Sequence, residues 1–513
     1  MNKSDGCRCI ATELYGAKPS SVVVTTPIYY INGAPHIGHA YASIAADVIA
    51  RFHRLDGSKV HLSTGTDEHG IKVARSAETI PMDVQKFADQ MSDKFREMNR
   101  AINLSEDDFI RTTENRHRES AQALWKLLEK DIYKDTYSGW YSARDEEYVA
   151  AEDVVDGNAP SGAPVEWMEE ESYFFRLSAY QDRLLDYYDK HPDFIAPPSR
   201  RNEVINFVKN GLRDFSISRN KFDWGVPVPD SNDHVMYVWI DALANYITSL
   251  GFPHNREYVS EMMANCIHVV GKEILRFHAV YWPAFLMSAG ISVPKRVFAH
   301  GWWVSEGQKM SKSIGNVVDP FEIIEKCGID SLRYFLLREI RFGEDGDFSN
   351  DAFQRRISYD LANDLGNLVQ RVLVFIQKLD GRLSVNYDFS SEEQILFVHA
   401  RGLWDSLRQL MEKQDLHGAL CCIWDLVSES NKFINDMRPW ELARTDVRRL
   451  NAVLTTLCES IRAIAFGLAP FMPGTARKIF DFMNVEGKSF RELSINFSDV
   501  RFDPPAPLFP RER

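Results

Sequence analysis

The chain has 513 residues, of which 44% are hydrophobic and 26% charged, and its formal net charge at pH 7 is −13. This length exceeds that of one compact domain, so we expect several folding units. No apolar run approaches the roughly twenty residues that a membrane-spanning helix needs, and the acidic balance gives no sign of a nucleic-acid-binding protein.

The N-terminal residues 1–20 contain Asp5 and Glu13 and lack the apolar core of a signal or transit peptide, so we expect a loose tail. The seven cysteines include no Cys-x-x-Cys pair, which disfavours a zinc knuckle and a disulfide framework. Scattered thiols are typical of a reducing compartment. We therefore predict a cytoplasmic protein without a metal site.

Residues 22–30 are β-branched and aromatic, which predicts a buried parallel strand. A turn follows, and apolar residues at helical spacing then begin at Ile37. Strand, turn and helix open a nucleotide-binding fold whose helix N-terminus is available to phosphate. We expect His36 and His39 on one face of the first helical turn, where both reach one ligand, while Gly38 lets a base or phosphate approach. A helix cap or a surface position is the alternative for either histidine.

A second strand, within residues 60–70, ends in a polar turn that contains Asp67. A carboxylate at the carboxyl end of such a strand is well placed to bind a substrate ammonium group. An Asx turn or a helix cap is the alternative for Asp67.

The pattern becomes irregular between residues 118 and 225, with short strand-like runs, a Gly/Pro-rich loop and no cysteine. We interpret this segment as an inserted subdomain. A strand leading into a helix follows at residues 234–246, and a further strand and helix follow at residues 266–278. Trp239, Ala242 and Tyr246 share one side of the first helix, and Ile274 and His278 share one face of the second, although such spacing also suits plain core.

Residues 294–304 form a strand-like run that leads to Lys309-Met310-Ser311-Lys312-Ser313, a short loop between Gly307 and Gly315. Two lysines in such a loop can neutralise the charge that develops on leaving pyrophosphate. A solvated basic turn is the alternative.

After about residue 347 the pattern is helical, with helices expected at 350–380, 391–413, 417–436, 440–466 and 474–481. Asn363, Asn367 and Arg371 are spaced by four on the first of these, and Trp440 stands at the start of the fourth. Amides and guanidinium groups can read unstacked base edges, and an exposed tryptophan can stack on a base. A buried polar stripe with Trp440 in the core is the alternative.

Two motifs in this order, His36-Ile37-Gly38-His39 and Lys309–Ser313, resemble the HIGH and KMSKS motifs of class I aminoacyl-tRNA synthetases. The segments around residues 27–30, 239–246 and 274–278 are similar to the methionine pocket of the methionyl-tRNA synthetase family, which often has proline where Leu243 stands. The resemblance implies catalytic roles for His36, His39, Lys309 and Lys312. It implies ATP binding by His36, Gly38, His39, His300, Gly301, Trp303, Val304, Lys309, Met310, Ser311, Lys312 and Ser313. It implies methionine binding by Pro27, Ile28, Tyr30, Asp67, Trp239, Ala242, Leu243, Tyr246, Ile274 and His278, and anticodon recognition by Asn363, Asn367, Arg371 and Trp440.

The fold that the resemblance implies is α/β: a Rossmann-like, doubly wound catalytic domain with an inserted connective subdomain, followed by an all-α helical bundle. The expected bounds are 1–20 for the tail, 21–117 and 226–299 for the catalytic halves, 118–225 for the insertion without a zinc knuckle, 300–349 for the KMSKS region and 350–513 for the anticodon-binding bundle. ATP with Mg²⁺, L-methionine and tRNA(Met) are the implied cofactors and partners, without structural zinc. A monomer is expected because no appended dimerising module follows.

Three other functions are possible on these residues. Another class I specificity, such as leucine or cysteine, is disfavoured because the insertion is too short for an editing domain and no Cys/His cluster is available for zinc. A HIGH-type adenylating ligase that does not use tRNA would lack the helical C-terminal part. A non-catalytic tRNA-binding paralogue would be expected to lose one of the two motifs, and both are intact.

Overall fold

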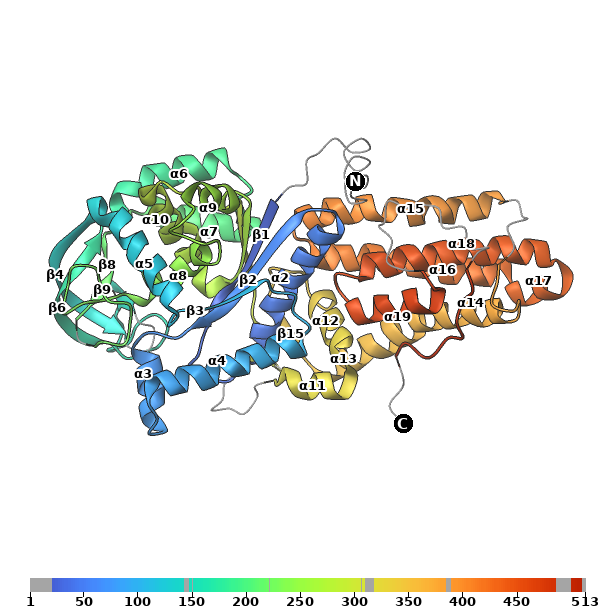
Figure 1. The fold of residues 1–513 in the computed structure, drawn as a ribbon, viewed down its shortest axis with the longest axis horizontal. Helices are drawn as coiled ribbons and strands as arrows, with labels where there is room; N and C mark the ends of the chain where they lie inside the picture. Colours follow the sequence, from blue (N-terminus) through green and yellow to red (C-terminus); the bar gives the residue numbers. More distant parts are fainter. Residues whose placement is uncertain are drawn as a thin grey trace, which may run out of the picture. The chain divides into compact units, whose positions relative to one another are not determined.

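The computed structural model describes residues 21–142, 147–149, 151–220, 222–305, 307–309, 318–383, 389–485 and 500–509 (Figure 1). Its contacts divide the chain into two units. Unit 1 takes its described residues from Met1–Pro35, Gly57–Arg100 and Leu104–His300. Unit 2 takes them from His36–Asp56, Ala101–Asn103 and Gly301–Arg513, so both units are discontinuous in sequence.

The centre of unit 1 is a six-stranded sheet in the order β3-β2-β1-β11-β12-β7, in which each neighbouring pair is parallel. Its strands are β1 (Ser21–Tyr30), β2 (Lys59–Asp67), β3 (Asp108–Arg111), β7 (Ile195–Ala196), β11 (Cys266–Gly271) and β12 (Arg296–His300). β1 forms because it is rich in β-branched residues, and its valines are buried as in a parallel strand covered on both faces. β2 and β3 approach so closely at Gly65 that a Cβ atom there would collide with the carbonyl oxygen of Ile110. This sheet and the helical C-terminal part confirm the predicted α/β fold class with an added all-α region.

The inserted part of unit 1 is antiparallel. A four-stranded sheet has the order β5-β4-β6-β8, and a separate pair joins β9 to β10. The strands are β4 (Ile132–Ser142), β5 (Glu147–Val149), β6 (Glu166–Phe175), β8 (Phe215–Ser216), β9 (Ser218–Arg219) and β10 (Val235–Met236). The strand expected before residue 238 is therefore present, but it pairs with β9 and lies outside the parallel sheet.

The helices of unit 1 connect and cover these sheets. They are α3 (Ile71–Thr79), α4 (Val84–Ala101), α5 (Asn115–Leu128), α6 (Gln181–Lys190), α7 (Pro198–Lys209), α8 (Val238–Thr248), α9 (Arg256–Met263) and α10 (Trp282–Ala289). Short turns of 3₁₀-helix occur at Glu129–Asp131, Ala151–Asp153, Leu177–Tyr180 and Lys272–Ile274. The helix expected from residue 271 is instead this last 3₁₀ turn, followed by a π-helical turn, η5 (Phe277–Tyr281), which leads directly into α10.

Unit 2 contains α2 (Ile37–Leu55), a three-stranded sheet in the order β14-β13-β15 and the C-terminal helices. The strands are β13 (Trp303–Ser305), β14 (Gln308–Lys309) and β15 (Gly346–Phe348). The helices are α11 (Pro320–Cys327), α12 (Ile329–Arg338), α13 (Asn350–Arg356), the π-helix η6 (Ile357–Gly366), α14 (Asn367–Gln377), α15 (Ser391–Glu412), α16 (Leu416–Met437), α17 (Pro439–Thr445), α18 (Val447–Leu468) and α19 (Pro473–Met483). Figure 1 shows α14, α15, α16 and α18 running alongside one another.

Helix α18 is the central helix of this bundle, because it is buried continuously from Leu450 to Leu468. The single helix expected at 440–466 is wrong. The chain breaks at Asp446, whose side chain accepts a hydrogen bond from the amide of Arg449 and so begins α18 as a new helix. The expected helix at 350–380 is present as three successive helical segments, with the π-helix in the middle.

Helix α2 is held within unit 2 by a buried arginine. The Arg333 side chain is fully buried and binds the Asp47 carboxylate at 2.6 Å. It also donates to the carbonyl oxygens of Ile102, Pro470 and Phe471 at 3.1, 2.9 and 2.7 Å. At the far end of α2, the Asp56 carboxylate accepts from Trp404 and Arg408 of α15. Unit 2 therefore joins an early helix of the chain to the C-terminal helices.

Candidate active site

The carboxyl ends of β1 and β2 bring the first group of predicted residues together. Tyr30 is the register partner of Asp67, which is the last residue of β2 and is 7% exposed. Pro27, Ile28 and Tyr30 are half-buried along β1. The Tyr30 hydroxyl donates to the carbonyl oxygen of His69 at 3.1 Å, which ties β1 to the turn after Asp67. Asp67 thus lies at the edge of the parallel sheet where such folds bind ligands.

Helix α8 supplies an aromatic wall in the same unit. Trp239 is half-buried and its ring stacks on that of Phe277, with centroids 3.7 Å apart and planes 6° from parallel. Ala242, Leu243 and Tyr246 are buried on the same helix. Sequence reasoning missed Phe277, although its place three residues after Ile274 is a usable signal.

Tyr246 and His278 form a buried hydrogen bond whose donor and acceptor can be assigned. The Tyr246 hydroxyl lies 2.6 Å from His278 Nε2, and His278 Nδ1 lies 2.9 Å from the carbonyl oxygen of Ile274. Burial lowers the pKa of His278 to about 4, so the ring is neutral at pH 7. A carbonyl can only accept, so Nδ1 carries the proton and Nε2 accepts from the tyrosine. The predicted residues Ile274 and His278 are therefore held to α8, and the wall that they complete is uncharged.

The two histidines of the first motif form a cap at the start of α2. His36 is the N-cap residue and the helix begins at Ile37, so His36 is not inside the first turn as expected. The His36 amide donates to His39 Nδ1 and the Gly38 amide donates to His36 Nδ1, each at 3.1 Å. The two rings lie 3.8 Å apart. Because each Nδ1 accepts, each ring carries its proton on Nε2, which is a donor suited to a phosphate oxygen.

The segment after β12 contains the other residues that the resemblance assigns to ATP. His300 is buried at the end of β12, and Gly301 follows where a Cβ atom would collide with the backbone of Glu344. The Trp303 ring is buried against Tyr41 and Phe335. If residue 303 contacts a nucleotide, we therefore expect its backbone to make the contact. Val304 is half-buried in β13 and pairs with Lys309 of β14. Met310, Ser311, Lys312 and Ser313 lie outside the described residues.

The four predicted anticodon residues lie on the helical bundle. Asn363 and Asn367 are exposed, on η6 and α14 respectively. Trp440 is 41% exposed, and the Arg371 guanidinium lies 6.0 Å from the centre of its ring. Arg371 also donates to the Asn435 side chain at 3.1 Å. The alternative of a buried polar stripe with Trp440 in the core does not fit these positions.

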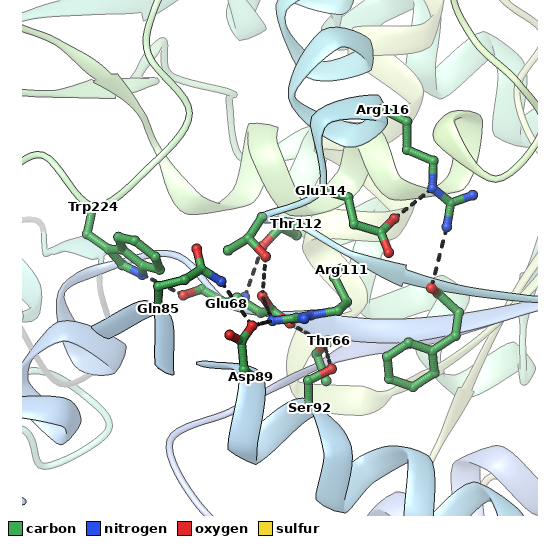
Figure 2. Close-up of polar contacts among 12 residues, drawn as sticks. Thr66, Glu68, Gln85, Asp89, Ser92, Arg111, Thr112, Glu114, Arg116 and Trp224 are labelled. Carbon is green, nitrogen blue, oxygen red and sulfur yellow. Dashed lines mark hydrogen bonds and ion pairs between the residues drawn. The ribbon is translucent and has the colours of Figure 1, made fainter. Parts of the chain in front are cut away.

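The turn after Asp67 is held by a buried polar network that sequence reasoning missed (Figure 2). The fully buried Glu68 carboxylate accepts from Arg111 Nε at 2.6 Å and Nη2 at 3.0 Å. It also accepts from Thr66 and Thr113, while the Glu68 amide donates to Thr112. The Glu68 carbonyl oxygen accepts from the Trp224 indole at 2.6 Å. These bonds connect strands far apart in sequence, so no local pattern reveals them.

The described residues show neither a metal-binding cluster nor a helix suited to span a membrane. Within them, no group of three or more His, Cys, Asp or Glu side chains is arranged to bind a metal ion. No helix in the described part of the chain combines the length and apolar character needed to cross a membrane.

A family model and individual relatives match this chain over most of its length. The model described as tRNA synthetases class I (M) matches residues 22–164 and 159–373. The methionine–tRNA ligase of Brucella suis is 48% identical over 505 residues, which cover 95% of this chain and 97% of that protein. The methionine–tRNA ligase of Rickettsia felis is 48% identical over 501 residues, which cover 95% and 98%.

Solved structures agree with these relatives. Methionyl-tRNA synthetase of Mycobacterium tuberculosis in complex with methionyl-adenylate has a TM-score of 0.93 and 47% identity, covering 96% of this chain and 100% of that one. The apo form of the same enzyme has a TM-score of 0.87 and 44% identity, covering 97% and 99%.

The parallel sheet, the helix that opens with His-Ile-Gly-His and the matching family model define a class I tRNA synthetase. The relatives match at close to half identity and along nearly their whole length. The chain belongs to the methionine–tRNA ligase family, which confirms the resemblance found in the sequence.

Proposed function

We propose that this chain activates L-methionine with ATP, releasing pyrophosphate, and transfers the methionyl group from methionyl-adenylate to tRNA(Met). The observation that carries the proposal is the pairing, in one unit, of a buried carboxylate at the sheet edge with an uncharged aromatic wall. The negative charge of Asp67 suits the substrate ammonium. The rings of Trp239, Phe277 and Tyr246 suit a thioether, for which aromatic contacts are favourable by roughly 0.3–1.5 kcal/mol.

The chemistry needs positioning and charge stabilisation and no protein nucleophile. The methionine carboxylate attacks the α-phosphate of ATP, which arrives as its Mg²⁺ complex, and pyrophosphate leaves. The Nε2–H groups of His36 and His39 donate to the phosphate oxygens, and Lys309 and Lys312 neutralise the pyrophosphate. The terminal ribose hydroxyl of tRNA then attacks the carbonyl carbon of methionyl-adenylate, so that an ester to tRNA forms, the bond to the phosphate breaks and AMP leaves.

ATP–pyrophosphate exchange with each amino acid in turn, with Mg²⁺ and without tRNA, tests this proposal. Exchange driven by methionine alone supports it. Exchange driven by leucine or cysteine replaces the proposed specificity and keeps the chemistry. If no amino acid supports exchange in the absence or presence of tRNA, the chain is a binding paralogue and the catalytic proposal is wrong.

Lys312→Ala is expected to slow methionyl-adenylate formation by about a hundred- to a thousandfold, the usual effect of removing one group that stabilises transition-state charge. The KM for methionine should change little, because Lys312 is proposed to act on pyrophosphate. Single-turnover adenylate formation measures the effect, and Lys326→Ala, an exposed lysine on α11, is the control. Wild-type adenylation rates in Lys312→Ala would rule out the role.

Trp440→Ala is expected to weaken tRNA binding roughly five- to a hundredfold, since stacking one base on an aromatic ring contributes about 1–3 kcal/mol. Exchange without tRNA should remain at the wild-type rate. Filter binding of tRNA(Met) transcript measures the effect, with Ile395→Ala as a control that removes an even more exposed apolar side chain from α15. Equal tRNA affinity in the two variants would remove Trp440 from the proposed anticodon site.

Other expectations from the sequence stay predictions with direct measurements. Sedimentation velocity tests the monomer, and elemental analysis of the purified protein tests the absence of structural zinc. Cell fractionation tests the cytoplasmic location. Limited proteolysis tests the predicted boundaries between the six segments.

A further inference from the structure

The Asp67 turn, defined here as Asp67, Glu68, His69 and Gly70, is fixed by two buried carboxylates on different elements. The first is Glu68 itself, which binds Arg111 and thereby holds the turn to the end of β3 (Figure 2). The second is Asp241 of α8, which accepts from His69 Nδ1 at 2.7 Å. The turn that presents the proposed ammonium ligand is therefore bonded directly to the helix that carries the aromatic wall.

The Asp241 carboxylate is fully buried and has a second partner. His117 Nε2 on α5 lies 2.8 Å from its other oxygen, and His117 Nδ1 lies 3.2 Å from Thr248 Oγ1 at the end of α8. Burial opposes ionisation of the Asp241 carboxyl, but the charge and hydrogen bonds of His69 and His117 outweigh it and lower its pKa to about 2. Asp241 is thus a carboxylate at neutral pH, and both imidazoles donate to it.

A buried carboxylate is an unusual residue at this position. Its neighbours on α8 are apolar, and an apolar side chain would avoid the desolvation that a buried charge requires. Asp241 is carried by the same helical turn as Trp239 and Ala242, so a shift of this turn would move the group that holds His69 together with these proposed methionine residues. Asp67 lies two residues before His69, so the bond of His69 to Asp241 ties the chain next to Asp67 to α8.

We propose that Asp241 is a positioning residue for methionine activation: through His69 it fixes the Asp67 carboxylate relative to the aromatic wall of α8. This inference rests on the proposed function. Loss of the bond should displace the ammonium site from the side-chain site, and small displacements of bound groups lower reaction rates strongly. Asp241 acts only through Asp67 in this scheme, so removing Asp67 should make Asp241 irrelevant to methionine affinity.

A double-mutant cycle in the exchange assay tests the inference. We expect Asp241→Asn and His69→Ala each to raise the KM for methionine by about tenfold or more and to leave the KM for ATP unchanged. We expect His69→Asn to restore most of the loss, because its amide nitrogen can replace Nδ1 as the donor. Asp67→Asn combined with Asp241→Asn should be no worse than Asp67→Asn alone.

The control is Asp131→Asn, which removes a carboxylate of the same unit that accepts from Tyr180 and Ser288 and contacts none of the proposed methionine residues. The inference would be overturned if the effects of Asp67→Asn and Asp241→Asn on the KM for methionine were additive, or if Asp241→Asn and Asp131→Asn raised this KM equally. In either case, methionine-driven exchange by the wild type would still support the proposed function. If Asp241→Asn fails to fold, His69→Ala and His69→Asn test the inference instead. Equal KM values for methionine in these two variants would overturn it. If the wild type shows no methionine-driven exchange, the proposed function fails and the inference falls with it.

Discussion

Asp67→Asn is expected to lower kcat/KM for methionine by between about thirtyfold and a few thousandfold, mainly through KM. The substitution keeps the size of the side chain and removes its charge, and truncating one partner of a buried charge pair costs about 2–5 kcal/mol. Asp67 is 7% exposed, so water screens the lost attraction little. Steady-state exchange at saturating ATP measures the effect.

A methionine analogue without the amino group distinguishes loss of the ammonium contact from general damage. In the wild type, 4-(methylthio)butanoate should inhibit exchange much more weakly than methionine binds. In Asp67→Asn that preference should largely disappear, because the discriminating charge is gone. A preserved preference for methionine over the analogue would show that Asp67 does not contact the ammonium group.

Arg333→Met is expected to destabilise unit 2 by about 3–5 kcal/mol, which is the effect of breaking a buried ion pair by removing one partner. The change removes a fully buried cation from Asp47, whereas Arg51, which also pairs with Asp47, is 22% exposed. It also deprives the carbonyl oxygens of Ile102, Pro470 and Phe471 of their donors. Chemical unfolding followed by circular dichroism measures the shift.

Arg477→Met is the matched control for Arg333→Met. Arg477 forms an ion pair with Asp481 on α19, but it is 78% exposed, and exposed pairs contribute little to stability. Its unfolding midpoint should remain near that of the wild type. Equal midpoints for the two variants would show that the buried pair of Arg333 and Asp47 does not stabilise the unit.

Elements with strong local patterns could be predicted from the sequence. In β1 the signal is a run of β-branched residues, and in α15 and α16 it is the helical spacing of apolar residues, so each pattern can be read within the element itself. These elements are found within a few residues of the expected bounds. Apolar spacing alone predicts one continuous helix across Asp446, because that spacing does not reveal the side-chain cap with which α18 begins. The pairing of β10 with β9 is set by tertiary contacts and not by the strand's own residues.

The candidate site was predictable where a motif or a helix face carried it. Trp239 and Tyr246 share a side of α8, so their spacing was informative. The bonds of Asp241 to His117 and His69 join residues 124 and 172 positions apart, and no spacing rule connects them. A charged residue inside the apolar run of α8 was nevertheless a signal that a buried partner exists.

The bond between Arg333 and Asp47 has a consequence for synthesis of the chain. The two residues lie 286 positions apart, and Trp404 lies 348 positions after its partner Asp56. At translation rates of about 5–20 residues per second, a ribosome needs roughly 15–60 s to make Arg333 after it has made Asp47. During this interval the apolar side chains of α2 lack their partners in unit 2. The nascent chain therefore carries an aggregation-prone helix until most of its C-terminal part has been made.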